Sequence, residues 1–206
     1  IEYHEYPDTG AVPLVSDMSS HIMSRPIDWG KLDLAFAGAQ KNLGPAGMAL
    51  VIIHKTLLEK CRDGLPAYLS YKIHAGKDSL YNTPPVFAIY MMKLTVDWVK
   101  EQGGLAEMEK RALERSGALY ETIDRSEGWY RCPVDTASRS RMNVCFRLPT
   151  EELEAKFIAE ALEANFSGLK GHRSVGGCRA SMYNAMPVEG AERLAEFMLQ
   201  FKQKNG

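Results

Sequence analysis

The sequence predicts an α/β protein with a mostly parallel sheet in residues 1–103 and a small α+β domain in residues 104–206. Short continuous apolar runs alternate with polar or glycine-rich turns in the first part, as in strands covered on both faces. The pair Gly103-Gly104 then interrupts two long helical patterns. Beyond it, alternating residues and amphipathic stretches are typical of half-exposed strands packed against helices.

Three strands are expected in the first part. Residues 12–15 form a short apolar run that ends at Ser16-Asp17, and residues 32–37 and 47–54 form two more. Such runs have the length and composition of buried strands. Glycines and a proline between the second and third strands indicate a tight turn, which contains Lys41.

Two helices should follow. Thr83 suits an N-cap and Pro84 the first helical position, so we expect a helix from there to the glycine pair. A second helix is expected over residues 105–124. Its main apolar positions are Met108, Leu113, Leu119 and Ile123.

The last part should contain two strands and two helices. Residues 141–148 and 178–183 are predicted to be strands, and residues 151–165 and 189–204 helices. The residues expected to face inward from the first of these helices are Leu153, Phe157, Ile158 and Leu162.

Composition excludes several classes of protein. The net charge of -1 lacks the basic excess of nucleic-acid binders, and no apolar run is long enough to span a membrane. Residues 1–5 are polar and do not resemble a signal peptide. The four cysteines have no C-x-x-C spacing, which favours neither a metal site nor a disulfide framework and suggests the cytoplasm.

Two residues of the first part could carry chemistry. Lys41 lies in a glycine-flanked turn after a buried strand, where α/β enzymes place their active sites. A lysine becomes nucleophilic when its pKa is lowered, although an ordinary solvated loop lysine is the alternative. Asp17 ends another strand and could pair with a cofactor cation such as a pyridinium nitrogen, or simply serve a turn.

Further candidates are anion binders. Asn82 and Thr83 precede a predicted helix, whose N-terminus could bind phosphate or could merely be capped by Thr83. His172, Arg173 and Arg179 lie among glycines, where the backbone can approach an anionic ligand closely. A surface hairpin with incidental charges is the alternative.

Taken together, these segments resemble the phosphoserine aminotransferase family of class V pyridoxal-phosphate-dependent enzymes. The resemblance covers essentially the whole chain. It rests on these segments in this order: Ser16-Asp17-Met18-Ser19-Ser20, Gly38-Ala39-Gln40-Lys41-Asn42, Tyr81-Asn82-Thr83-Pro84-Pro85, Ser140-Arg141-Met142-Asn143-Val144 and Lys170-Gly171-His172-Arg173-Ser174-Val175-Gly176-Gly177-Cys178-Arg179-Ala180-Ser181.

The resemblance implies a fold type I transferase and a role for each candidate. Lys41 would form the Schiff base with pyridoxal 5'-phosphate and act as the catalytic residue, and Asp17 would pair with the pyridinium nitrogen. Gln40 would contact the cofactor phosphate. The remaining roles are a phosphate contact across a homodimer interface for Asn82 and Thr83, binding of the substrate phosphate for His172 and Arg173, and binding of the substrate carboxylate for Arg179.

The implied reaction is transamination between 3-phosphohydroxypyruvate with L-glutamate and O-phospho-L-serine with 2-oxoglutarate, in serine biosynthesis. The 4-phosphohydroxy-L-threonine of pyridoxine biosynthesis is a further candidate substrate. Family members are longer, so we expect this chain to be the C-terminal part, with part of the cofactor domain. Two alternatives stay open: another class V enzyme, such as a cysteine desulfurase, and an inactive or binding-only fragment.

Overall fold

The computed structural model describes all 206 residues and divides them into two compact units. The first unit is Tyr6–Leu105, and the second is Ile1–Glu5 together with Ala106–Gly206. The sequence analysis placed residues 1–5 with the first part. In the structure the Glu2 backbone N–H donates to the Ser138 carbonyl, and the Glu2 carboxylate accepts the Arg141 N–H at 3.0 Å. These bonds tie the first residues to the second unit.

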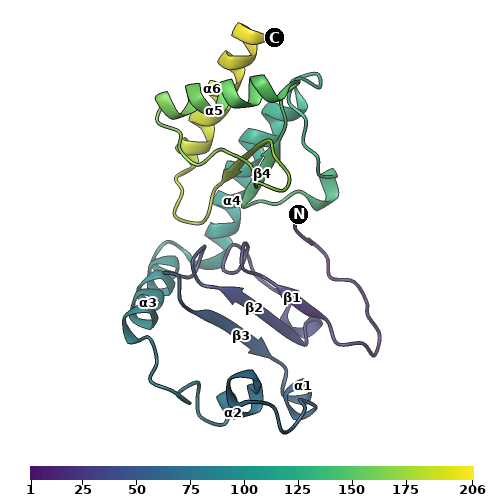
Figure 1. Cartoon of the computed structure of the whole chain (residues 1–206), viewed down its shortest axis with the longest axis vertical. Coiled ribbons are helices and arrows are strands. Elements are labelled where there is room, and N and C mark those ends of the chain that lie inside the picture. Colours follow the sequence, from purple (N-terminus) through teal and green to yellow (C-terminus); the bar gives the residue numbers. More distant parts are fainter. The chain divides into compact units, whose positions relative to one another are not determined.

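The first unit contains a three-stranded sheet in the order β1 (Val15–Asp17), β2 (Leu34–Gly38), β3 (Ala49–Ile53) (Figure 1). β1 and β2 run parallel, with Asp17 opposite Phe36, whereas β2 and β3 are antiparallel. β1 begins three residues later than expected. Pro13 has no N–H for a strand ladder, and the Leu14 N–H donates instead to the Asp33 carboxylate.

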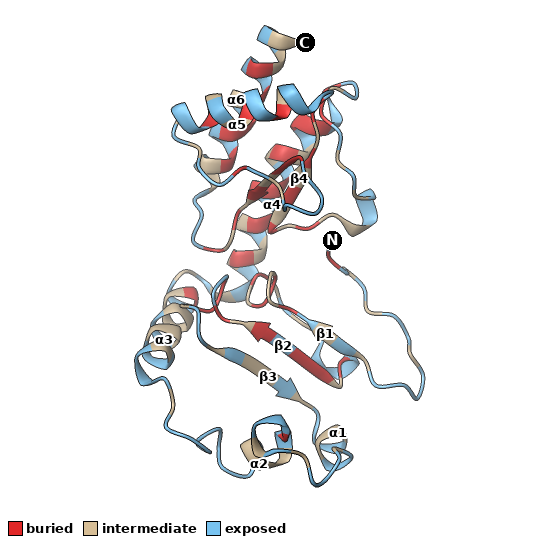
Figure 2. Cartoon of the chain, viewed as in Figure 1, coloured by how far each residue is buried: buried red, intermediate tan, exposed pale blue.

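The strands of this sheet differ in burial. Figure 2 shows β2 largely buried, whereas β3 is partly or fully exposed along its length. The expectation that all three apolar runs are covered on both faces is therefore wrong in this chain for β1, which has no buried residue, and for β3. The core around β2 consists of Met18, Ile22, Leu32, Ala35, Ala37, Ala39 and Leu43.

Three helices follow the sheet: α1 (Lys55–Glu59), α2 (Tyr71–Ala75) and α3 (Val86–Glu101). Sequence analysis expected neither of the two short ones. It also placed the start of α3 too early, because Pro85, not Thr83, is the N-cap and provides no side-chain bond. A residue that precedes proline is disfavoured in helical conformation, so Pro84 cannot open the helix ahead of Pro85.

The second unit packs three helices around a two-stranded antiparallel sheet. They are α4 (Gly104–Asp124), which begins at the unit boundary, α5 (Glu151–Glu163) and α6 (Val188–Asn205). β4 (Asn143–Phe146) pairs with β5 (Cys178–Ser181), with Cys145 opposite Arg179. These elements agree with the predicted ones to within a few residues at each end. Three short 3₁₀ turns complete the chain, at Trp29–Lys31, Ala67–Leu69 and Thr136–Ser138.

Two apolar positions named from the sequence are exposed, and one of them, Leu162, was wrongly predicted to face inward. Leu113 of α4 is 49% exposed and Leu162 of α5 is 63% exposed. In each helix the preceding alanine, Ala112 or Ala161, occupies the fully buried position. Adjacent helical residues differ by about 100° in direction, so only one of each pair can face the core.

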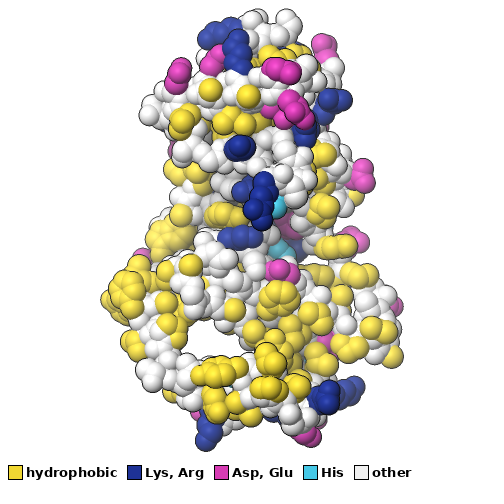
Figure 3. All heavy atoms as spheres, in the orientation of Figure 1, with side chains coloured by type: hydrophobic (Ala, Val, Ile, Leu, Met, Phe, Trp, Pro, Cys, Tyr) yellow, Lys and Arg dark blue, Asp and Glu magenta, His cyan; other side chains and the backbone are white.

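Apolar side chains are exposed on the first unit, over α3 and the segment before it (Figure 3). The most exposed are Tyr68, Leu69, Leu80, Val86 and Phe87, each at least 60% accessible. Exposed apolar patches are typical of surfaces that contact other protein or bind ligands. None of the helices is both long and apolar enough to cross a membrane.

Candidate active site

The carboxyl ends of β1 and β2 bring Asp17 and Lys41 to one edge of the sheet. Asp17 is the last residue of β1, and β2 ends at Gly38, three residues before Lys41. Because the two strands are parallel, the residues that follow them emerge at the same edge. Ligands of open α/β sheets bind at this edge.

Ser19 fixes the Asp17 carboxylate to the end of β2. Its backbone N–H donates to Asp17 Oδ1 at 2.8 Å, and its hydroxyl oxygen accepts the Gly38 N–H at 2.9 Å. The Ser19 hydroxyl is the main cause of a lowered pKa at Asp17; the Lys41 charge also lowers this pKa, while partial burial opposes the shift. Asp17 is therefore an anion at neutral pH and fits a cationic partner such as a protonated ring nitrogen.

The turn that carries Lys41 is fixed by its neighbours. The buried Asn42 amide donates to the Ile22 carbonyl at 3.1 Å, and the Gly44 N–H donates to the Ala39 carbonyl at 2.8 Å. Lys41 itself is exposed and makes no hydrogen bond. The backbone at Lys41 is thus fixed by its neighbours, while the Lys41 amine remains available.

Gln40 is also exposed, and its side chain folds back over Gly38. A Cβ atom at Gly38 would lie 2.7 Å from Gln40 Oε1, so the glycine provides the space for this amide. The NH₂ group of a side-chain amide can donate hydrogen bonds to a phosphate. The Asp17 carboxylate as an acceptor, the Gln40 amide and the Lys41 amine fit pyridoxal phosphate.

Asn82 and Thr83 are not brought to this edge. They are exposed in the segment that leads from α2 to α3, on the side of β3 away from β1 (Figure 1). The Asn82 amide donates only to the neighbouring Thr83 carbonyl, at 3.0 Å. They also lie before the start of α3 at Val86, so they do not form the helix N-terminus that the sequence predicted there.

His172 and Arg173 lie in an exposed loop of the second unit, residues 170–177. His172 Nδ1 lies 2.7 Å from the Ser174 hydroxyl, and the His172 carbonyl accepts the N–H groups of Val175 and Gly176. The loop borders a hollow of about 680 Å³ whose walls also include side chains of α5. Exposed cations beside a hollow can bind an anion.

Arg179 lies in β5 at the end of this loop. Its backbone N–H donates to the Leu169 carbonyl at 2.8 Å, which fixes the base of the side chain. Its Nε atom is buried without a hydrogen-bond partner. A buried N–H of a guanidinium needs an acceptor, and a substrate carboxylate is one.

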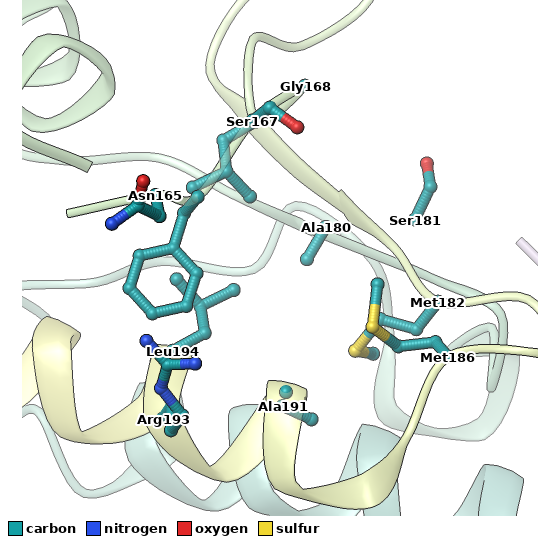
Figure 4. Close-up of a pocket in the computed structure, with 13 residues that line it drawn as sticks. Asn165, Ser167, Gly168, Ala180, Ser181, Met182, Met186, Ala191, Arg193 and Leu194 are labelled. Atoms are coloured by element: carbon teal, nitrogen blue, oxygen red, sulfur yellow. The ribbon is translucent and has the colours of Figure 1, made fainter. Parts of the chain in front are cut away.

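A second hollow in this unit was not predicted from the sequence. It has a volume of about 330 Å³ and lies between β5, the start of α6 and the residues after α5 (Figure 4). Met182, Met186, Ala191 and Leu194 give it a mainly apolar wall, and Arg193 stands over the Phe166 ring at 5.7 Å. It lacks the convergent donors of an active site.

Comparison with known proteins gives consistent matches. The family model described as aminotransferase class-V matches residues 4–194. The phosphoserine aminotransferase of Geobacillus kaustophilus is 55% identical over 98% of this chain and 56% of its own length. The chain thus spans little more than half the length of this relative.

Solved structures agree. Phosphoserine aminotransferase from Bacillus circulans subsp. alkalophilus has a TM-score of 0.94 at 48% identity, over 99% of this chain and 56% of that one. The pyridoxal-phosphate-bound enzyme from Trichomonas vaginalis has a TM-score of 0.90 at 40% identity, over 97% and 56%. The fold type I transferase fold predicted from the sequence is confirmed.

Proposed function

The chain belongs to the aminotransferase class-V family. We propose that it is part of a pyridoxal-phosphate-dependent phosphoserine aminotransferase. The reaction exchanges an amino group between L-glutamate and 3-phosphohydroxypyruvate, giving O-phospho-L-serine and 2-oxoglutarate. The observation that carries the proposal is the placement of an available lysine and an anionic aspartate at one sheet edge.

Each residue has a separate task in the proposed mechanism. Bound pyridoxal phosphate supplies an electron-poor ring that withdraws electrons from the substrate Cα. The Asp17 anion would pair with the ring nitrogen of the bound cofactor and keep it protonated. Lys41 Nζ would remove the proton from the substrate Cα as a general base and then deliver it to the C4′ carbon of the cofactor as a general acid.

The second unit orients the substrate in this proposal. Arg179 Nε, which has no partner within the chain, donates to the substrate carboxylate. His172 and Arg173 bind the phosphate group. Binding both ends of a small substrate fixes the direction of its Cα–H bond, which raises the rate of proton transfer.

The experiment that tests the function replaces Lys41 in the cofactor-loaded enzyme. Lys41→Ala should abolish transamination, because no other exposed amine replaces it at this edge, whereas the exposed Lys60→Ala should remain active. Borohydride reduction should join the cofactor covalently to the peptide that contains Lys41. Attachment to a different lysine would contradict the assignment.

The proposal includes a homodimer with shared sites. Asn82 and Thr83 contact nothing at their own chain's sheet edge but lie beside exposed apolar side chains such as Leu80 and Phe87. A second subunit that covers this surface would accept hydrogen bonds from the side chains of Asn82 and Thr83. Mixing Lys41→Ala subunits with Asn82→Ala/Thr83→Ala subunits should restore activity through one intact site per heterodimer. Confirmed heterodimers without activity would count against shared sites.

We also place the enzyme in the cytoplasm. All four cysteines are free, which supports a reducing compartment. Cys145 and Cys178 lie in β4 and β5, and burial raises the pKa of the Cys178 thiol to about 12. Neither has the mobile, ionised thiol that a cysteine desulfurase needs, so the aminotransferase is the better candidate.

A further inference from the structure

The loop of residues 170–177 carries two proposed phosphate binders on a short turn. Its two ends meet through the Gly171 N–H, which donates to the Gly177 carbonyl at 2.8 Å. Within the loop, Val175 and Gly176 donate to the His172 carbonyl. These bonds shape the turn but do not tie its tip to the rest of the unit.

Arg147 provides that tie. It follows β4, and its Nη1 atom donates to the Val175 carbonyl at 2.9 Å. Its Nε atom lies 2.6 Å from Glu154 Oε1 in α5, whose side chain is only 8% exposed. The same Glu154 oxygen accepts the Leu148 N–H at 3.3 Å. One planar guanidinium therefore joins the loop to a buried carboxylate on a helix.

A glycine pair makes room for this contact. Gly176 and Gly177 have φ values of +75° and +69°, in the left-handed region. A Cβ atom at Gly177 would lie 2.5 Å from Arg147 Cδ and 2.9 Å from the Phe146 carbonyl oxygen. The loop is thus packed directly on the Arg147 side chain, in a way that only glycine allows.

We propose that Arg147 is a positioning residue that orders the 170–177 loop so that His172 and Arg173 can bind the substrate phosphate. The inference rests on the proposed function. Glu154 already balances the Arg147 charge, so Arg147 acts through the Val175 carbonyl and not as a phosphate ligand. Losing Arg147 should loosen the loop while leaving the chemistry at Lys41 intact.

The test uses the complete, cofactor-loaded enzyme with Arg147→Met, which keeps an apolar stem but cannot donate. We expect KM for O-phospho-L-serine to rise about tenfold, the usual effect of losing one charge-assisted hydrogen bond. We expect kcat to change less than about twofold, and kcat/KM for L-serine to stay the same. The KM of Arg147→Lys for O-phospho-L-serine should lie between those of the wild type and Arg147→Met. An ammonium group can pair with Glu154 but lacks the planar arrangement of donors of a guanidinium.

Arg125→Met is the matched control. Arg125 forms an exposed ion pair with Glu121 in the same unit, so its loss should leave every constant unchanged. Hydrogen exchange gives a readout that is independent of substrate. The amides of Val175 and Gly176 should exchange at least tenfold faster in Arg147→Met and normally in the control.

The possible outcomes separate the two proposals. A wild-type enzyme without preference for O-phospho-L-serine over L-serine would contradict the proposed function, and exchange would still decide the role of Arg147. Unchanged exchange at Val175 and Gly176 would overturn that role whatever the substrate. Equal losses of kcat/KM for both substrates would also overturn it, because they would mean general damage to the site.

Discussion

Replacing Ser19 with alanine should raise the pKa of Asp17 and lower the free energy of unfolding. The loss of unfolding free energy should depend on pH. The Ser19 hydroxyl is the main cause of the lowered pKa of Asp17, and it also accepts the Gly38 N–H. Ser19→Ala removes a hydrogen bond to a charged group and leaves one backbone donor without its acceptor. Such losses cost about 1–3 kcal/mol, and the partial exposure of Asp17 places the expected loss of unfolding free energy near about 1 kcal/mol.

The direction of the pH dependence follows from the depressed pKa. Asp17 has a lower pKa in the folded state than an aspartate in the unfolded chain, where it is about 3.9, so its anion stabilises the fold above that pH. This stabilisation is lost as the pH falls through the folded pKa. The difference in unfolding free energy between wild type and Ser19→Ala should therefore be largest at neutral pH and should narrow below about pH 4.

Urea unfolding from pH 3 to pH 7 measures this difference. Ser20→Ala is the matched control, because Ser20 is adjacent and half-buried but its hydroxyl makes no hydrogen bond. As the pH is lowered, cofactor affinity, followed by absorbance, should begin to fall at a higher pH in Ser19→Ala than in Ser20→Ala. The same pH dependence in Ser19→Ala and Ser20→Ala would contradict the role of the Ser19 hydroxyl. A difference that stays constant to pH 3 would mean that Ser19 acts only through Gly38.

Two further predictions test the second unit. Phe157→Ala should lower the unfolding free energy by about 3–5 kcal/mol, because this fully buried ring contacts four other aromatic rings. Leu162→Ala on the same helix should change it by less than about 0.5 kcal/mol; similar effects in urea unfolding would contradict the assigned core. Native alkylation at pH 8, followed by mass spectrometry, should label Cys61 well before Cys178, whose burial raises its pKa to about 12. Early modification of Cys178 would contradict its burial.

Sequence patterns predicted the strands and helices where local chemistry decides them. β2 and α4 are examples: an uninterrupted apolar run formed the strand, and a glycine pair marked the start of the helix. The pattern failed where one residue restricts the next. Pro84 before Pro85 moved the start of α3, and Pro13 delayed β1. Both errors follow from proline rules that outweigh apolar periodicity.

The residues that support the site were harder to predict than the residues assigned to act in it. The backbone bond of Ser19 had a local signal, because an aspartate side chain commonly accepts the backbone N–H two residues on, in an Asx turn. Arg147 had none. Its contacts with Val175 and Glu154 join an arginine after one strand to a loop 28 residues away and to a helix. Such a contact depends on tertiary packing, which spacing along the chain does not encode.

The surroundings of Lys41 explain why polar and glycine residues cluster around it. A lysine that acts as a nucleophile and a proton carrier must be placed accurately, yet a hydrogen bond or ion pair would occupy its amine. The turn separates these demands: Asn42 and Gly44 make the bonds that fix the backbone, while Lys41 makes none. Because Asn42 is buried, substituting it would leave two carbonyls without their donor and move the amine. The available amine therefore depends on the bonds of its neighbours.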